Sequence, residues 1–145
     1  MSDRETAAGP RVLDARAGPL DEAELARAAA HVASGGLLGH PTETVYGFGG
    51  LATDAGVAAL KRLKPGRDRP FILLVPSPEA VAQLAWTPSA RALAEVFWPG
   101  ALTLVLADPS NSFPAGLQGE GGGVAVRVTP HPVTRALVEV SGCPR

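Results

Sequence analysis

The residues best suited to chemistry begin with an oxygen-rich segment, residues 40–50 (HPTETVYGFGG), which follows an apolar run and ends in a glycine cluster. Thr42, Thr44 and Tyr46 alternate along it, and alternate side chains of an extended strand point to one face. Hydroxyl groups gathered on one face can hydrogen-bond a small polar substrate. The pattern therefore predicts a polar patch where this strand ends.

Two further apolar segments repeat this arrangement. Thr103, in the run that starts at residue 101 (ALTLVLA), points away from the leucines around it, and Arg127, in residues 124–128 (VAVRV), points away from the three valines. If these strands are neighbours, one sheet face is aliphatic and covered by helices, and the other carries hydroxyls and a guanidinium. This favours a polar pocket. The alternative is that threonine is simply a good strand former and that Arg127 faces water.

A basic segment, residues 61–70 (KRLKPGRDRP), holds five of the 13 lysines and arginines of the chain. At a helix C-terminus such charges often act as caps on a solvated face. The same residue types also suit a triphosphate, because lysine is a point charge and arginine a bidentate donor. The prolines and glycine of the segment fix a turn, which favours a phosphate clamp formed by Lys64, Arg67 and Arg69.

Sharper catalytic and metal motifs are missing from the sequence. It contains no Walker A motif, no G-x-S-x-G and no H-E-x-x-H. His31, His40 and His131 have no carboxylate or cysteine at ligand spacing, so we expect no metal site built by protein side chains. The single cysteine, Cys143, excludes an internal disulfide and a thiolate cluster, and we expect an inert thiol at a strand end.

Residues 47–52 (GFGGLA) match G-x-G-x-x-A, the dinucleotide-binding fingerprint, between an expected strand and an expected helix. The strand that should end in a ribose-binding acid, residues 71–75, is instead followed by Pro-Ser-Pro. Dinucleotide binding is therefore kept as a minor hypothesis.

Length and composition limit the number of domains and the class of protein that can position these residues. With 145 residues, 46% hydrophobic and 19% charged, and a formal charge of −1, we expect one globular domain and neither disorder nor an extended polycationic surface. Residues 1–19 form a polar lead-in with a short strand at 11–13, and the domain covers 20–145. No apolar run is long enough to span a bilayer and no signal core is visible, so we expect a cytoplasmic protein.

Capping residues and apolar periodicity predict alternating helices and strands, typical of the α/β class. The expected helices are 22–34, a helix with Asp54 as N-cap that ends near 64–66, 78–85, 88–97 and 133–140. The expected strands are a short one that leads from 37–38 into the 40–50 segment, 71–75, one from 101, and 124–128. A long flexible loop without any element is expected at 108–123.

Taken in order, PTETVYGFGG, the basic turn before PFILLV, WPGALTLVL and VAVRVTPHP closely resemble the YrdC-like family of threonylcarbamoyl-AMP synthases. The resemblance runs from about Gly36 to Pro144. It implies an α/β fold in which helices pack on a twisted, largely parallel sheet that curves around a concave polar and basic cavity.

The resemblance also implies an activity. Family members combine L-threonine, bicarbonate and ATP into threonylcarbamoyl-adenylate and pyrophosphate, a nucleotidyl transfer that feeds the t6A modification of tRNA adenosine 37 through downstream transfer proteins. It implies ATP as substrate, Mg²⁺ held through phosphates, and no nucleophilic side chain. Some members also bind double-stranded RNA.

Site residues follow from their position in the motifs. The resemblance places Thr42, Thr44 and Tyr46 near threonine, with Thr103 and Arg127 completing that pocket from neighbouring strands. It places Lys64, Arg67 and Arg69 on the triphosphate.

The sequence departs from the family pattern in two places. The family lysine and arginine are separated by one residue, whereas Lys64 and Arg67 are separated by two, so the register of this turn is open. The family also continues beyond G-x-P (residues 142–144) into a strand with an S-x-N motif that contacts the nucleotide, and this sequence ends at Arg145. Ser110-Asn111 lies in a loop at the wrong spacing.

We therefore expect a domain that is incomplete at its C-terminal side and exposes apolar sheet surface. A fragment, a truncated reading frame and a degenerate paralogue each account for this. The alternative function is a non-catalytic YrdC-like module that binds double-stranded RNA or nucleotide.

Overall fold

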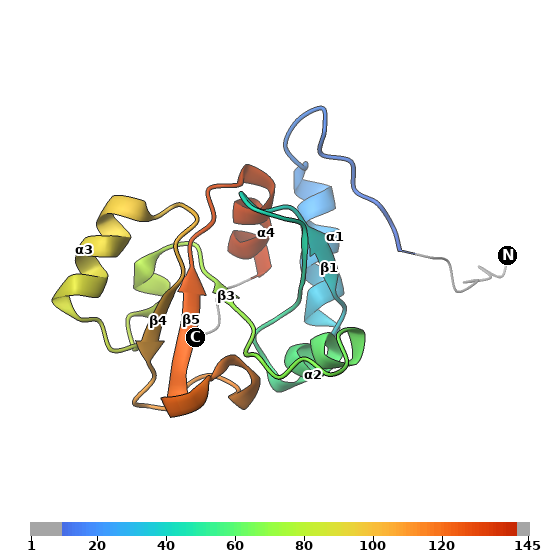
Figure 1. Ribbon diagram of the computed structural model, residues 1–145. Coiled ribbons are helices and arrows are strands. Elements are labelled where there is room, and N and C mark those ends of the chain that lie inside the picture. The colour runs from blue at the N-terminus through green and yellow to red at the C-terminus, as the bar shows by residue number, and fades with distance from the viewer. Residues whose placement is uncertain (1–9, 142–145) are drawn as a thin grey trace, which may run out of the picture.

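The computed structural model describes residues 10–141, in which helices and short strands alternate (Figure 1). The elements are α1 (Glu22–Ala33), β1 (Leu38–His40), β2 (Gly47–Gly49), α2 (Asp54–Leu63), β3 (Leu73–Leu74), η1 (Pro78–Val81), α3 (Pro88–Phe97), β4 (Leu104–Ala107), η2 (Ala115–Leu117), η3 (Glu120–Gly122), β5 (Gly123–Arg127) and α4 (Pro132–Ser141), where η marks a single 3-10 turn. This confirms the α/β class.

Three strands form the central sheet in the order β3-β5-β4. β5 pairs in parallel with β3, with Leu74 opposite Arg127, and antiparallel with β4, with Leu104 opposite Val126. Parallel pairing within the described residues is thus confined to β3 and β5. The expected strand 71–75 is reduced to two residues, although Val75 N–H still donates to the carbonyl of Arg127 at 3.1 Å.

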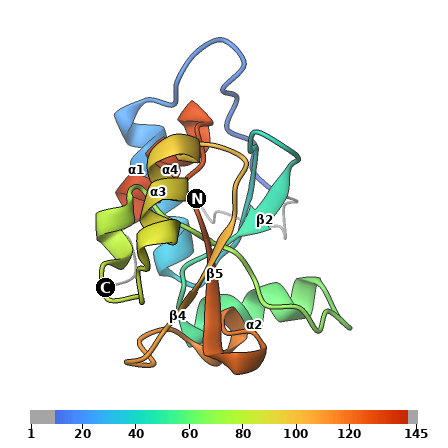
Figure 2. The same cartoon turned by 60° about the vertical axis from the view of Figure 1, so that its left-hand side comes forward.

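The predicted alternation holds in β4 and β5. Leu104, Leu106, Val124 and Val126 are buried, and Arg127 is half-buried on the opposite face. The buried face packs into one core with the inner side of α3 and with Val57 and Leu60 of α2. Elsewhere, α1 lies against α4 (Figures 1 and 2), and Figure 1 shows α3 apart from both. The other sheet face is less covered, and Val105 remains 70% exposed.

β1 and β2 form a separate antiparallel pair, with Leu38 opposite Gly49. Contrary to the predicted strand, the segment between them is a turn, so Thr42, Thr44 and Tyr46 do not share a strand face. The physical reason is local: the Thr42 hydroxyl accepts from the amides of Thr44 and Val45 and donates to the carbonyl of Val45. Such side-chain bonds compete with a strand ladder.

The hairpin also bears on the dinucleotide-binding hypothesis for residues 47–52. The dinucleotide fingerprint needs a parallel strand that leads directly into a helix. Gly47 and Gly49 instead belong to β2, which pairs only antiparallel with β1 among the described strands. The dinucleotide hypothesis therefore loses its structural context.

The helix predictions were confirmed for most of the chain, with two corrections, and one strand prediction was wrong. The N-cap of α2 is Thr53, not Asp54, because the Thr53 hydroxyl accepts from the Gly56 amide at 3.1 Å. The expected helix 78–85 is the single turn η1, since the chain then bends and Ala85 N–H donates to Ala107 of β4. The expected strand at 11–13 is absent.

The predicted structureless loop 108–123 was also wrong, because it contains η2 and η3. The Asp108 carboxylate organises it: one oxygen accepts from the amide and hydroxyl of Ser112, and the other from Phe113 N–H and Gln118 Nε2. Phe113 and Leu117 are buried in the core. Four hydrogen bonds to one carboxylate thus hold this segment in place of the regular backbone hydrogen bonds of a helix or strand. Cys143 and the G-x-P lie outside the described residues.

Candidate functional site

A cleft of about 300 Å³ lies where β1, β2, α2, β3 and α4 meet. Its polar lining includes Thr42, Thr44, Lys64, Arg67 and Arg127, so the structure brings five of the eight predicted site residues to one cavity. Phe48, Phe71 and Leu74 are among its apolar lining. No aspartate or glutamate is among the lining residues of the described chain, and the charged side chains in the lining are cationic.

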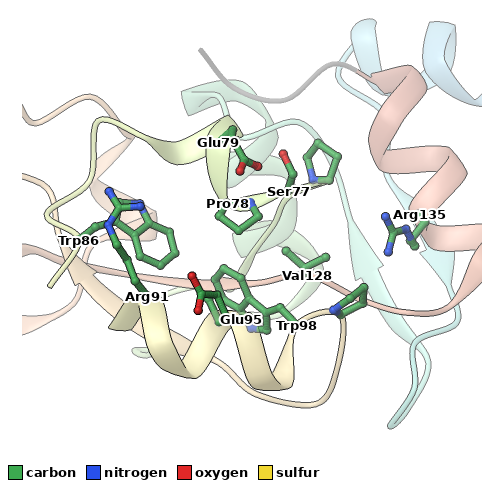
Figure 3. A pocket seen from close by; sticks show the side chains of 12 residues that line it. Ser77, Pro78, Glu79, Trp86, Arg91, Glu95, Trp98, Val128 and Arg135 are labelled. Carbon is green, nitrogen blue, oxygen red and sulfur yellow. The ribbon is translucent and has the colours of Figure 1, made fainter. Parts of the chain in front are cut away.

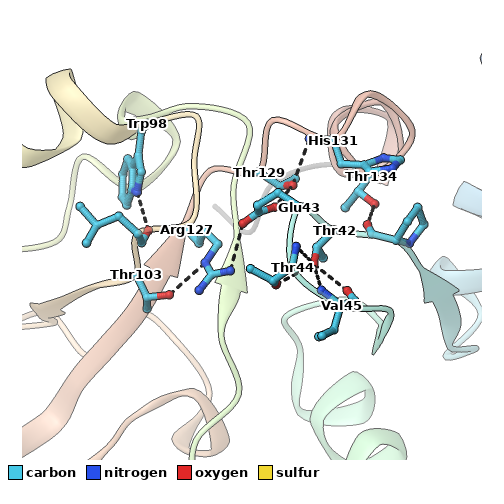
Figure 4. Close-up of polar contacts among 12 residues, drawn as sticks. Thr42, Glu43, Thr44, Val45, Trp98, Thr103, Arg127, Thr129, His131 and Thr134 are labelled. Atoms are coloured by element: carbon cyan, nitrogen blue, oxygen red, sulfur yellow. Dashed lines mark hydrogen bonds and ion pairs between the residues drawn. The ribbon is translucent and has the colours of Figure 1, made fainter.

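Arg127 is held in place by two side chains at the end of β5 (Figure 4). Its Nε donates to the hydroxyl of Thr103 at 3.0 Å, and one terminal nitrogen donates to Oε1 of Glu43 at 3.0 Å. Thr103 thus touches Arg127 rather than lining the cleft itself. The second terminal nitrogen has no protein partner in the described part of the chain. A fixed guanidinium with spare donors is suited to a carboxylate or a phosphate.

Glu43 lies behind Arg127 and is the residue that joins the site together. Its side chain is 14% exposed and that of Arg127 is 17% exposed. The second carboxylate oxygen accepts from the hydroxyl of Thr129 at 2.6 Å, and Thr129 is 1% exposed. Partial burial raises the pKa of the Glu43 carboxyl, but the Thr129 hydrogen bond and the Arg127 charge outweigh it, so the pKa lies below its ordinary value. Glu43 is therefore anionic at neutral pH.

The turn that bears Thr42 is anchored at both sides. Thr42 and Thr44 bring their hydroxyl oxygens within 3.1 Å of each other. The buried Thr134 of α4 donates to the carbonyl of Pro41, and Glu43 bonds to β5 and to Thr129 beyond it. The hydroxyl pair is thus fixed relative to Arg127, although the residues come from distant parts of the sequence.

The basic turn contributes Lys64 and Arg67 to the cleft, but not Arg69. Arg67 is bound to its own turn, since Nε and a terminal nitrogen donate to the carbonyls of Arg69 and Pro70, both at 3.2 Å. Its guanidinium carbon lies 5.0 Å from the ring centroid of Phe71. Lys64 and Arg69 are exposed. Tyr46 is 83% exposed and does not line the cleft either.

No group of three or more His, Cys, Asp or Glu side chains in residues 10–141 is placed to hold a metal ion. His40 lines the cleft, and burial lowers its pKa, which favours the neutral imidazole.

Sequence reasoning missed three residues that shape the site: Glu43, Thr129 and Thr134. Glu43 lies within the PTET block, but its odd parity put it on the opposite face of an assumed strand. Thr129 and Thr134 follow β5, and only burial reveals them: at 1% and 2% exposure they are the buried polar residues of the described chain. The sequence did offer one indication of them: both threonines lie in or just after the TPHP segment, which directly follows the strand that bears Arg127.

A comparison with models of protein families shows to which family this chain belongs. The Sua5/YciO/YrdC family model, whose description is "Telomere recombination", matches residues 30–144. The chain belongs to this family. The family resemblance drawn from PTET, WPG-x-LT and VAVR is thereby confirmed.

Curated relatives carry one common name. The threonylcarbamoyl-AMP synthase of Pyrococcus abyssi is 39% identical over 131 residues, which are 86% of this chain and 38% of that protein. The threonylcarbamoyl-AMP synthase of Marinobacter nauticus is 34% identical over 127 residues, 83% of this chain and 66% of that protein. This Sua5/YciO/YrdC chain thus spans roughly two-fifths to two-thirds of the relatives it matches.

Solved structures agree with the fold. A doubly substituted Sua5 of P. abyssi superposes with a TM-score of 0.82 at 35% identity, over 90% of this chain and 40% of that one. P. abyssi Sua5 in complex with L-threonine superposes with a TM-score of 0.74 at 38% identity, over 84% of this chain and 37% of that one. No helix in the described residues is long and apolar enough to cross a membrane.

Proposed function

We propose that this chain carries the threonine- and nucleotide-binding part of a threonylcarbamoyl-AMP synthase. The reaction converts L-threonine, bicarbonate and ATP into threonylcarbamoyl-adenylate and pyrophosphate, as the activated donor for t6A at tRNA adenosine 37. The observation that carries the proposal is Arg127, which Glu43 and Thr103 fix at the cleft with spare guanidinium donors. The names of the relatives and the threonine complex of one solved Sua5 support the substrate class.

Threonine would bind between Arg127 and the hydroxyl pair. Its carboxylate pairs with the second terminal nitrogen of Arg127, and its side-chain hydroxyl hydrogen-bonds with Thr42 and Thr44, whose oxygens are 3.1 Å apart. Thr103 acts through Arg127 as a positioning residue. Tyr46 is exposed, so we assign it to the rim that closes over the amino acid. Serine, which lacks one methyl group, is the substrate analogue that tests this pocket.

ATP would bind with its triphosphate against the basic turn. Lys64 and Arg67 supply cationic donors from the cleft wall, and the exposed Arg69 adds charge at longer range. Because no carboxylate lines the cleft among the described residues, Mg²⁺ would be held through phosphate oxygens and water.

The chemistry needs no side-chain nucleophile. The uncharged amine of threonine attacks the carbon of bicarbonate, and the elements of water leave to give a carbamate. A carbamate oxygen then attacks the α-phosphorus of ATP, and the bond to pyrophosphate breaks. The protein contributes positioning and neutralisation of the developing charge. We place this activity in the cytoplasm, where ATP, tRNA and the downstream transfer proteins are present.

A second candidate function rests on the basic segment itself. The five lysine and arginine side chains of residues 61–69 are all exposed, which favours contact with the phosphates of a nucleic acid. In this case the chain is a non-catalytic module that binds double-stranded RNA or nucleotide. The electrophoretic mobility of duplex RNA or tRNA at low salt distinguishes the two functions. A non-catalytic RNA-binding module slows the migration of the RNA whether or not threonine is present.

Titration calorimetry with L-threonine, alone and with a non-hydrolysable ATP analogue, tests the proposal. We expect saturable threonine binding that weakens at least about tenfold in Arg127→Gln. Equal binding by wild type and Arg127→Gln would contradict it, provided that both proteins show the same cooperative thermal unfolding.

A further inference from the structure

A second cavity, of about 340 Å³, shares no lining residue with the threonine cleft (Figure 3). It lies just beyond the carboxyl ends of the parallel strands β3 and β5, where Ser77 follows the first and Val128 follows the second. Small molecules bind preferentially in the crevice outside the carboxyl ends of parallel strands. The position thus suits a ligand site, independent of any role for the first cleft.

Two tryptophans shape the apolar part of this cavity. Trp86 and Trp98 meet edge to face, with ring centroids 5.9 Å apart and planes at 89°. Their indole N–H groups are used inside the protein, by the carbonyls of Val81 at 3.1 Å and Leu102 at 2.7 Å. The rings therefore offer apolar surface and no donor. A proline-rich peptide, which tryptophan N–H groups commonly recognise through its carbonyls, is disfavoured as the occupant.

Four charged side chains surround this apolar surface. Arg91 and Arg135 are cationic, and Glu79 and Glu95 are anionic. None of the four belongs to an ion pair within residues 10–141, whereas the described chain does form such pairs elsewhere. Arg91 lies over Trp86, 5.5 Å from its ring centroid. Figure 3 shows Arg135 at one end and the Trp86–Arg91 pair at the other, with Glu95 and Trp98 between them.

We propose that this cavity binds an apolar zwitterion of the size of a large amino acid. Two cations and two carboxylates give the lining no net charge, which disfavours a polyphosphate and matches a ligand with one ammonium and one carboxylate. Arg135 would take the carboxylate and Glu95 the ammonium, while the side chain packs on Trp98, Pro78 and Val128. A cavity of this volume lies at the small end of ligand pockets and has room for a molecule of this size.

The sequence provides a reporter for the test, because the chain has two tryptophans and both line this cavity. L-phenylalanine is the probe, titrated to about 10 mM while tryptophan fluorescence is excited selectively. We expect a saturable change with a millimolar or lower dissociation constant. Phenethylamine and phenylacetate, each with a single charge, should bind at least about tenfold more weakly, and glycine should leave the signal unchanged.

Glu95→Gln and Arg135→Gln remove one charge each from the wall of the cavity. Each should raise the dissociation constant for L-phenylalanine at least about tenfold. Arg27→Gln, exposed on α1 and absent from the lining of both cavities, is the matched control and should bind as wild type. No saturable change, equal binding of the singly charged analogues, or equal binding by both charge variants would each overturn the proposal. Threonine binding is measured separately by calorimetry, so failure at either site is seen independently.

Discussion

Glu43 and Arg127 lie 84 residues apart in the sequence and form an ion pair of 3.0 Å. The pair joins the threonine-rich turn after β1 to the last residue of β5. Within residues 10–141 it leaves one terminal nitrogen of Arg127 without a protein partner, and it leaves Glu43 bonded to Thr129. The arrangement separates two tasks: Glu43 positions the turn, and Arg127 lines the cleft.

Arg127→Lys keeps the charge but loses the planar fork that bonds Thr103, Glu43 and a ligand together. We expect the dissociation constant for L-threonine to rise roughly ten- to a hundredfold, with little change in ATP binding. Calorimetry measures both. Arg62→Lys is the control, and full threonine affinity in Arg127→Lys would show that the fork is dispensable.

Glu43→Gln should destabilise the fold by about 1–3 kcal/mol at neutral pH, because it leaves Arg127 without a charged partner in a largely covered position. Urea unfolding measures this change in the free energy of unfolding. Glu139→Gln, exposed on α4, is the matched control. A loss no larger than that of the control would mean that the ion pair contributes nothing.

The same pair predicts a pH dependence. Because the pKa of Glu43 is lowered in the folded state, its stabilising contribution is complete above its unfolded pKa, which is near 4.5, and is lost as the pH falls through the lower folded value. The free energy of unfolding of wild type should therefore fall more steeply below pH 4.5 than that of Glu43→Gln. Parallel curves for the two proteins would contradict this.

The basic turn can be mapped residue by residue. Lys64 and Arg67 line the cleft and Arg69 does not. We therefore expect Lys64→Ala and Arg67→Ala each to weaken the binding of a non-hydrolysable ATP analogue about tenfold. Arg69→Ala should have a smaller effect, within about threefold. A larger loss for Arg69→Ala than for Arg67→Ala would shift the register of the turn by two residues.

Asp108→Ala removes the acceptor for four donors in the 108–118 segment. We expect faster hydrogen exchange and faster proteolysis there, with a loss of stability of about 1–3 kcal/mol. Ser110→Ala, exposed in the same loop, serves as the control. Unchanged exchange at Ser112 and Phe113 would show that the loop is held by Phe113 and Leu117 alone.

The limits of sequence reasoning follow from which interactions are local. α3 was predicted to the residue because Thr87, Pro88 and the break after Phe97 are all contiguous signals. The faces of β4 and β5 were predicted because alternation is also local. Residues 42–46 alternate just as regularly, yet the Thr42 hydroxyl makes them a turn.

Glu43 shows why the rest could not be predicted. Its partners, Arg127 and Thr129, are 84 and 86 residues away, and nothing near Glu43 in the sequence indicates them. The family resemblance predicted that these segments contribute to one site, and five of the eight predicted side chains line one cleft. The structure alone shows which side chains face the cleft and which support them.

The most direct test is pyrophosphate release by this chain from ATP and bicarbonate, with and without L-threonine, and with L-serine as the specificity control. We expect threonine-dependent release that serine supports poorly and that Arg127→Ala abolishes. Release that is absent with threonine, or equal for threonine, serine and no amino acid, would contradict it.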